Sequence, residues 1–176
     1  TAAAALARTK DPDALTVLLE ASQSDDVQVR RSGVYALANY APEDVVPALT
    51  TLAQDSDSSI RYSALNALGR FKTRAATEAI VKALEKNPSL ASIVMSALRN
   101  QDTADAAGAL VAIYKSSSGS DRQRAESYLK RMRTPEAQQL LAEAIAEAQE
   151  ASAGAPPMLA NQNPLGVLNG WGYLID

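Results

Sequence analysis

An internal repeat of about 31 residues constrains this chain more than any other feature of its sequence. Residues 29–40 and 60–71 align position by position at an offset of 31, with Arg, Ser, an Ala-Leu pair and a closing aromatic residue in register. A second apolar series falls between these segments, at Leu18, Leu49, Ile80, Leu110 and Leu141. Two interleaved series that share one period predict a repeated helix–turn–helix unit.

The spacing inside each unit is helical. One helical face of the segment 26–40 carries Val29, Gly33, Ala36, Leu37 and Tyr40. The predicted helices, several of which begin at or near a proline, are 1–8, 12–22, 26–40, 43–54, 58–71, 74–86, 88–100, 103–116, 120–132 and 135–150. We therefore expect an all-α fold over residues 1–150, an α-solenoid of stacked helical hairpins with a right-handed superhelical sense.

Composition narrows the chemistry available to the chain. Its 176 residues include no His and no Cys. This excludes disulfides, thiolate catalysis and thiolate zinc sites, and with them Ser-His-Asp triads and most zinc hydrolases. No carboxylates stand at a spacing that would form an acid–base pair, and the glycines form no phosphate-binding loop. We expect no catalytic residue, no metal and no cofactor.

Charge and hydropathy limit the partners. The net charge is −3, without the basic excess that attracts nucleic acid. No segment reaches the roughly 18 consecutive apolar residues of a membrane-spanning helix, and no charged-then-apolar leader opens the chain. We expect a soluble protein whose partner is a protein rather than a nucleic acid or a membrane. The sequence does not distinguish the cytoplasm from the periplasm.

The repeat resembles the HEAT-like repeats of the phycobilisome-lyase type, a short form known from bacteria. The motif of that family has Asp, two further residues, Val-Arg, small residues, Ala-Leu and a closing apolar residue. Residues 26–40 and 57–71 follow it nearly throughout, while the next repeat has Ala91 at the Arg position. The resemblance covers about residues 1–150 and is closest in two repeats.

The resemblance implies an α-solenoid whose commonest role is protein binding. It also implies a structural role for Arg30 and Arg61, since in similar repeats this Arg pairs with an Asp of a neighbouring loop. Asp26 and Asp57 are the expected partners, so these four residues should form a ladder between repeats rather than contact a ligand. The family also includes subunits that attach bilin chromophores to cysteines of partner proteins.

The variable positions of the second helix in each unit predict a binding surface. They are Arg31, Tyr35, Asn39, Tyr62, Asn66, Arg70, Ser92 and Ser96. Second helices line the concave side of a solenoid, so we expect one continuous row of these side chains, the concave strip. Tyr and Arg are enriched at interface hot spots, which favours a protein-binding surface over an ordinary solvated helix face.

Residues 151–176 break the repeat. They combine Gly, Pro and Asn with many apolar residues, and they contain the only Trp, Trp171, which is not typical of a solvating tail. This tail either caps the last hairpin, as terminal repeats require, or docks as a peptide into a neighbouring molecule. If the tail docks into a neighbouring molecule, that molecule could be a second copy of this chain, so self-association through the tail stays open. In both, Trp171 and Tyr173 should be buried anchors.

Together these features predict a non-catalytic scaffold or adaptor that binds a partner protein on the concave strip. One alternative is a chromophore-lyase-like subunit whose chemistry takes place on the partner. Another is a structural repeat segment of a larger protein. Neither the identity of the partner nor the oligomeric state is predicted by the sequence.

Overall fold

The computed structural model describes residues 12–154, and these form helices joined by short turns. The α-helices are α2 (Pro12–Ala21), α3 (Val27–Leu37), α4 (Pro42–Leu52), α5 (Ser58–Leu68), α6 (Arg74–Lys86), α7 (Ala91–Gln101), α8 (Ala104–Ser116), α9 (Gly119–Leu129) and α10 (Pro135–Gly154), and one 3₁₀ helix, η1 (Pro88–Leu90), precedes α7. The predicted all-α solenoid of helical hairpins is confirmed. The predicted right-handed sense stays a prediction.

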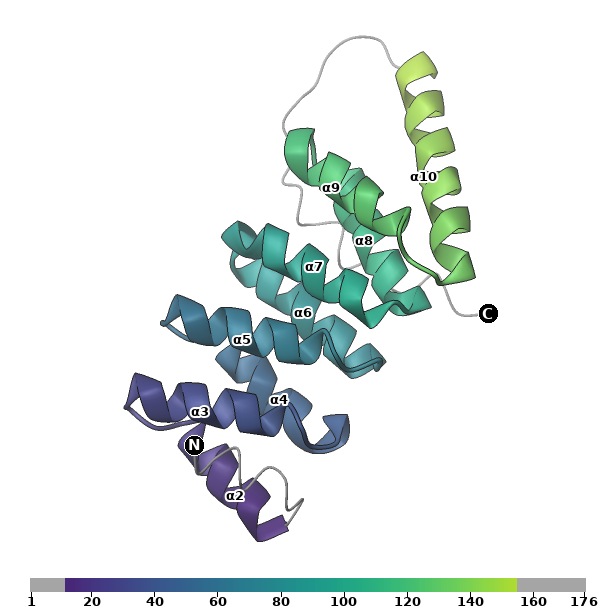
Figure 1. Ribbon diagram of the computed structural model, residues 1–176. Coiled ribbons are helices and arrows are strands. Elements are labelled where there is room, and N and C mark those ends of the chain that lie inside the picture. Colours follow the sequence, from purple (N-terminus) through teal and green to yellow (C-terminus); the bar gives the residue numbers. More distant parts are fainter. Residues whose placement is uncertain (1–11, 155–176) are drawn as a thin grey trace. The chain divides into compact units, whose positions relative to one another are not determined.

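The described residues divide into two compact units between Gln101 and Asp102. In the first unit, α2–α3, α4–α5 and α6–α7 are helical hairpins stacked along the chain. The second helices α3, α5 and α7 lie side by side in one layer, with α4 and α6 behind them (Figure 1). In the second unit, α8, α9 and α10 pack against one another.

Both apolar series of the repeat lie in the core. Leucines at the Ala-Leu position of each repeat are fully buried, at Leu37, Leu68, Leu98 and Leu129. The side chains of the second apolar series are at most 3% exposed; they are Leu18, Leu49, Ile80, Leu110 and Leu141. The shared period therefore identified these apolar series correctly as core residues.

The second helices of the first two hairpins, α3 and α5, end three residues before the predicted boundary. The sequence predicts that they run to Tyr40 and Phe71, but α3 ends at Leu37 and α5 at Leu68. The backbone N–H of Tyr40 donates to the carbonyl of Leu37 at 3.0 Å, and that of Phe71 to Leu68 at 3.1 Å. These three-residue turns are tighter than an α-helical turn, and both aromatic residues at their ends are buried.

Two other local predictions are wrong. The helical spacing predicts a buried Val29, but this residue is 41% exposed, whereas Ile60 at the same repeat position is fully buried. Ile60 has α3 beside its helix, while α3 is the first helix of its layer in the described part of the chain. The helix predicted from residue 88 begins instead with η1, whose Leu90 N–H donates to the Asn87 carbonyl at 3.0 Å.

Gly69 allows α5 and α7 to approach closely. A Cβ atom on this residue would lie 2.9 Å from both the Cα and the carbonyl oxygen of Ala97 in α7. Real Cβ atoms essentially never approach other heavy atoms so closely. The backbone of Gly69 is right-handed helical, with φ −64°, so any residue could adopt it. Space, rather than conformational freedom, is what this glycine supplies.

Gly69→Ala should therefore lower the free energy of unfolding by about 2 kcal/mol, because α7 must move away to admit the methyl group. Urea unfolding followed by circular dichroism would measure the loss. The matched control is Gly108→Ala in α8, where a Cβ would meet nothing within 4 Å. That change should raise stability by roughly 0.5–1 kcal/mol through helix propensity. Equal effects at both glycines would contradict the close approach.

A buried amide joins three helices of the first unit. The Gln101 side chain, at the end of α7, is fully buried. Its Nε2 donates to the carbonyl of Phe71, beyond the end of α5, at 2.8 Å and to that of Leu68, the last residue of α5, at 3.4 Å. Its Oε1 accepts from the hydroxyl of Thr77 in α6 at 2.9 Å. Gln101 thus satisfies the Phe71 carbonyl, and it adds a second donor to the Leu68 carbonyl, which already accepts the Phe71 N–H.

Side-chain contacts also connect the helices of the second unit. The Arg122 guanidinium stacks over the ring of Tyr114, 4.4 Å from its centroid, and Nη2 donates to the Tyr114 hydroxyl at 3.0 Å. Asp102 has a left-handed backbone, with φ 51°. Its carboxylate accepts from the backbone N–H groups of Arg133 and Thr134, just before α10. The positive φ is strained for a non-glycine residue, and these hydrogen bonds offset that cost.

Candidate protein-binding surface

Six of the eight residues of the concave strip lie on the second helices of the first unit, and the other two, Asn39 and Arg70, lie in the turns that follow α3 and α5. Tyr35 of α3 is 63% exposed and Tyr62 of α5 is 46% exposed. The other members are exposed or half-buried, namely Arg31, Asn39, Asn66, Arg70, Ser92 and Ser96. Because α3, α5 and α7 are neighbours in one layer, the strip follows adjacent helices. Large exposed apolar side chains are few in the described residues, and both strip tyrosines are among them.

Part of the strip already bridges two repeats. Arg31 Nη2 donates to Ser59 Oγ at 2.6 Å and lies 4.0 Å from the nearer carboxylate oxygen of Asp57. The Tyr35 hydroxyl accepts a long hydrogen bond from Ser63 Oγ, at 3.5 Å. These contacts hold the side chains of α3 against α5. Because these contacts already restrict the Arg31 and Tyr35 side chains, the two residues lose less rotamer entropy on binding a partner than freely rotating side chains would.

The ladder arginine Arg30 pairs with Asp55, a residue that the repeat pattern did not predict. Its Nε donates to Asp55 Oδ2 at 2.8 Å and its Nη2 to Asp55 Oδ1 at 3.1 Å, a two-pronged pair between the first two hairpins. Its Nη1 donates to the backbone carbonyls of Ser24 and Asp25. The prediction that Arg30 would pair with Asp26 or Asp57 is wrong, although the predicted link between repeats exists.

Asp26 and Asp57 are helix N-caps instead. The Asp26 carboxylate accepts the N–H of Gln28 at 2.7 Å, and Asp57 accepts that of Ser59 at 2.9 Å. Their repeat position is one residue before the helix, where a carboxylate satisfies N–H groups that lack helical partners. Asp55 has no acidic counterpart one period away, so periodicity could not identify it as the partner of Arg30.

Arg61 occupies the position of Arg30 one repeat later, but no carboxylate of residues 12–154 pairs with it. Its Nη1 donates to the carbonyls of Asp55 at 2.7 Å and Ser56 at 2.8 Å, the equivalents of Ser24 and Asp25. Its Nε is buried and makes no hydrogen bond. Of the ladder predicted at two repeats, the structure therefore contains one ion pair.

Local contacts shift the ionisation of the ladder residues. Burial acts to raise the pKa of Asp55, but hydrogen bonds from Arg30 and the Asp57 N–H, with the charge of Arg30, outweigh it and lower this pKa. Hydrogen bonding from the Ser59 hydroxyl, followed by that from the backbone of Ile60, lowers the pKa of Asp57. A carboxylate whose pKa is lower in the folded state stabilises the fold fully above its unfolded pKa, near 3.9. That stabilisation is lost as the pH falls through the folded value.

Asp55→Asn should lower the free energy of unfolding near neutral pH and make its fall below about pH 4 shallower than in the wild type. Urea unfolding at a series of pH values from neutral to about 2.5 would show this. Glu85→Gln, at an exposed position of α6, is the control and should follow the wild-type curve. If the Asp55→Asn curve runs parallel to the wild type throughout, Asp55 does not contribute to acid sensitivity.

Residues 151–154, predicted as the start of the tail, continue α10 instead. The rest of the tail, with its predicted anchors Trp171 and Tyr173, lies outside the described residues. Within residues 12–154, no group of three or more acidic, His or Cys residues could hold a metal ion. No helix in that range combines the length and the apolar character needed to cross a bilayer.

Comparison with known families identifies the repeat. The model of the family described as HEAT repeats matches residues 21–95, and that of the PBS lyase HEAT-like repeat matches residues 1–24. No curated protein gave a significant match. HEAT repeats generally serve as protein-interaction scaffolds and are typically non-catalytic. Together with the stacked hairpins, these matches show that the chain is a HEAT-like repeat protein.

Proposed function

We propose that this chain is a non-catalytic adaptor that binds a partner protein on the concave strip. The observation that carries the proposal is the exposure of Tyr35 and Tyr62 on adjacent helices of one layer. An exposed tyrosine offers a large apolar surface and a hydroxyl at a low entropic cost, which is why this residue type is enriched at hot spots.

The polar neighbours of these tyrosines support the same proposal. The side chains of Tyr62, Asn66 and Arg70 make no hydrogen bond to another side chain or backbone group in the described structure. They therefore offer donors and acceptors to a partner without breaking internal contacts. An ordinary solvated helix face would carry mainly Lys and Glu, residues that are depleted at interfaces.

A lyase-like role on a partner protein is the second candidate, and the match to the PBS lyase HEAT-like repeat favours it. In that case the strip would bind the acceptor protein of a chromophore. Incubating the purified chain with a bilin and recording its absorbance tests this directly. A shifted bilin spectrum would support the lyase-like role, and an unchanged spectrum would count against it.

The double variant Tyr35→Ala/Tyr62→Ala should keep the wild-type melting temperature but lose its partner. Affinity capture from native lysate with quantitative mass spectrometry names the partner, and titration with that purified protein then measures the dissociation constant. Removing two hot-spot tyrosines should weaken binding by at least about 30-fold, at 1 kcal/mol or more for each residue.

Val17→Ala is the matched control, since Val17 is 52% exposed on α2, outside the strip. It should bind the same partner as tightly as the wild type. A dissociation constant equal to that of the wild type in the double variant would show that the binding site lies outside the concave strip. A large drop in melting temperature would show that the tyrosines support the fold, contrary to their exposure.

A further inference from the structure

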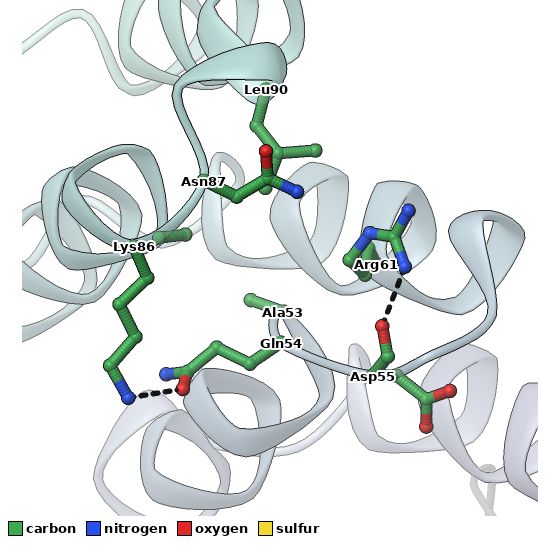
Figure 2. Close-up of a pocket in the computed structure, with 8 residues that line it drawn as sticks. Ala53, Gln54, Asp55, Arg61, Lys86, Asn87 and Leu90 are labelled. Atoms are coloured by element: carbon green, nitrogen blue, oxygen red, sulfur yellow. Dashed lines mark hydrogen bonds between the residues drawn. The ribbon is translucent and has the colours of Figure 1, made fainter.

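A cavity of about 280 Å³ opens in the first unit, where the second and third hairpins meet. It lies between the end of α4, the first turns of α5 and the end of α6. Figure 2 shows the side chains of Arg61, Lys86 and Asn87 around it, together with the apolar Leu90. None of these residues belongs to the concave strip.

Arg61 presents an unused pair of donors here. The hydrogen bonds of its Nη1 to two loop carbonyls repeat those of Arg30, so both guanidinium groups are held in the same way. In Arg30 the Nε and Nη2 groups bind the Asp55 carboxylate. In Arg61 the Nε is buried without a hydrogen bond, and the Nη2 has no partner in the described structure. A buried donor without an acceptor costs free energy that a ligand oxygen would recover.

The position that corresponds to Asp55 in the next repeat carries a basic residue in place of a carboxylate. One period of 31 residues after Asp55 stands Lys86. Its Nζ donates to Gln54 Oε1 at 2.5 Å, at the rim of the cavity (Figure 2). The site that holds a carboxylate in the preceding repeat is therefore lined here by two positively charged side chains, Arg61 and Lys86.

The remaining polar groups of the site also fit an anion. Asn87 accepts through Oδ1 from Ser89 and donates no hydrogen bond through Nδ2 to a described residue. The one acidic residue of the lining, Asp55, faces away from the cavity with its carboxylate bound to Arg30 (Figure 2). A planar carboxylate suits the paired Nε and Nη2 donors of an arginine better than a single-point acceptor does.

We propose that this cavity is a carboxylate-binding site, and that its ligand is an acidic side chain of a protein partner that takes the place of the missing ladder aspartate. The site is independent of the concave strip, so a partner that uses both would make two separate contacts with the first unit. The Arg61 guanidinium binds the carboxylate through Nε and Nη2, and Lys86 contributes charge.

Nuclear magnetic resonance of the full chain tests the site at the atom concerned. The ¹⁵N–¹H signal of Arg61 Nε is followed while the blocked tripeptide acetyl-Ala-Asp-Ala-amide is added. The control peptide, acetyl-Ala-Asn-Ala-amide, differs only in that an amide replaces the carboxylate. We expect a saturable shift of the Arg61 signal with the Asp peptide, weakened by added salt, and none with the Asn peptide.

Lys86→Asp supplies the missing carboxylate from within the chain. It should move the Arg61 Nε signal without peptide, raise the melting temperature and abolish the response to the Asp peptide. The Tyr35→Ala/Tyr62→Ala variant should respond like the wild type, which separates this proposal from the proposed function. Equal responses to the two peptides, or an unchanged response in Lys86→Asp, would overturn the assignment.

Discussion

Leu68→Asp should abolish the folded state of the first unit. Leu68 is fully buried in α5, at the junction of neighbouring hairpins. Removing a buried leucine costs about 2–5 kcal/mol, and placing an unpaired carboxylate in the same volume costs several more. That sum is comparable to the total stability of a typical domain, about 5–15 kcal/mol. The variant should show strongly reduced helical circular dichroism at 222 nm and no cooperative urea transition.

The matched control for this substitution is Asn66→Asp. It introduces the same carboxylate into the same helix two residues earlier, but at an exposed position. Its free energy of unfolding should lie within about 0.5 kcal/mol of the wild-type value. A cooperative transition in Leu68→Asp at near wild-type urea concentration would mean that α5 does not pack through this face.

Gln101→Leu should cost about 3 kcal/mol, although it places an apolar side chain in a buried site. The change leaves the carbonyl of Phe71 without its hydrogen bond. The Thr77 hydroxyl, whose single proton can be donated to Gln101 at 2.9 Å or to the Thr73 carbonyl at 3.3 Å, keeps only the longer contact. Each buried polar group left unsatisfied costs about 1–3 kcal/mol. Urea unfolding of the purified variant measures the loss.

A double-mutant cycle separates these contributions. Thr77→Val removes the hydroxyl, so in the Thr77→Val/Gln101→Leu double variant only the Phe71 carbonyl loses its hydrogen bond. The double variant should therefore be more stable than the sum of the single changes indicates. Asn100→Leu, at the exposed neighbouring position of α7, is the control and should be nearly neutral. Strict additivity would contradict a direct link between Gln101 and Thr77.

The repeat period predicted the fold well, because burial of one helical face is the property that repeats most regularly. The leucines at the Ala-Leu position recur wherever a hairpin must bury that face. Helix ends were predicted less well, since they depend on single hydrogen bonds. Nothing in the sequence distinguished a helix that continues to Tyr40 from one that closes with a three-residue turn at Leu37.

The polar contacts were predicted least well, because they occur once rather than at each period. Asp55 and Gln101 each bind across helices, yet the residues one period before them are Ser24 and Arg70. A search for repeated residues therefore passes over them. The tyrosines of the concave strip were placed correctly on an exposed face because exposure, like burial, follows the helical period. Their role in binding stays a prediction.

The single ion pair of the ladder makes the two junctions of the first unit respond differently to solvent conditions. The junction between the first and second hairpins includes the Arg30–Asp55 pair, which acid and concentrated salt weaken. The next junction replaces it with apolar packing and the buried Gln101 amide, which neither condition affects strongly. Because each hairpin of a solenoid is stabilised mainly by its neighbours, acidification should detach the α2–α3 hairpin first. In hydrogen exchange, the amides of α3 would then lose protection while those of α5 and α7 keep it.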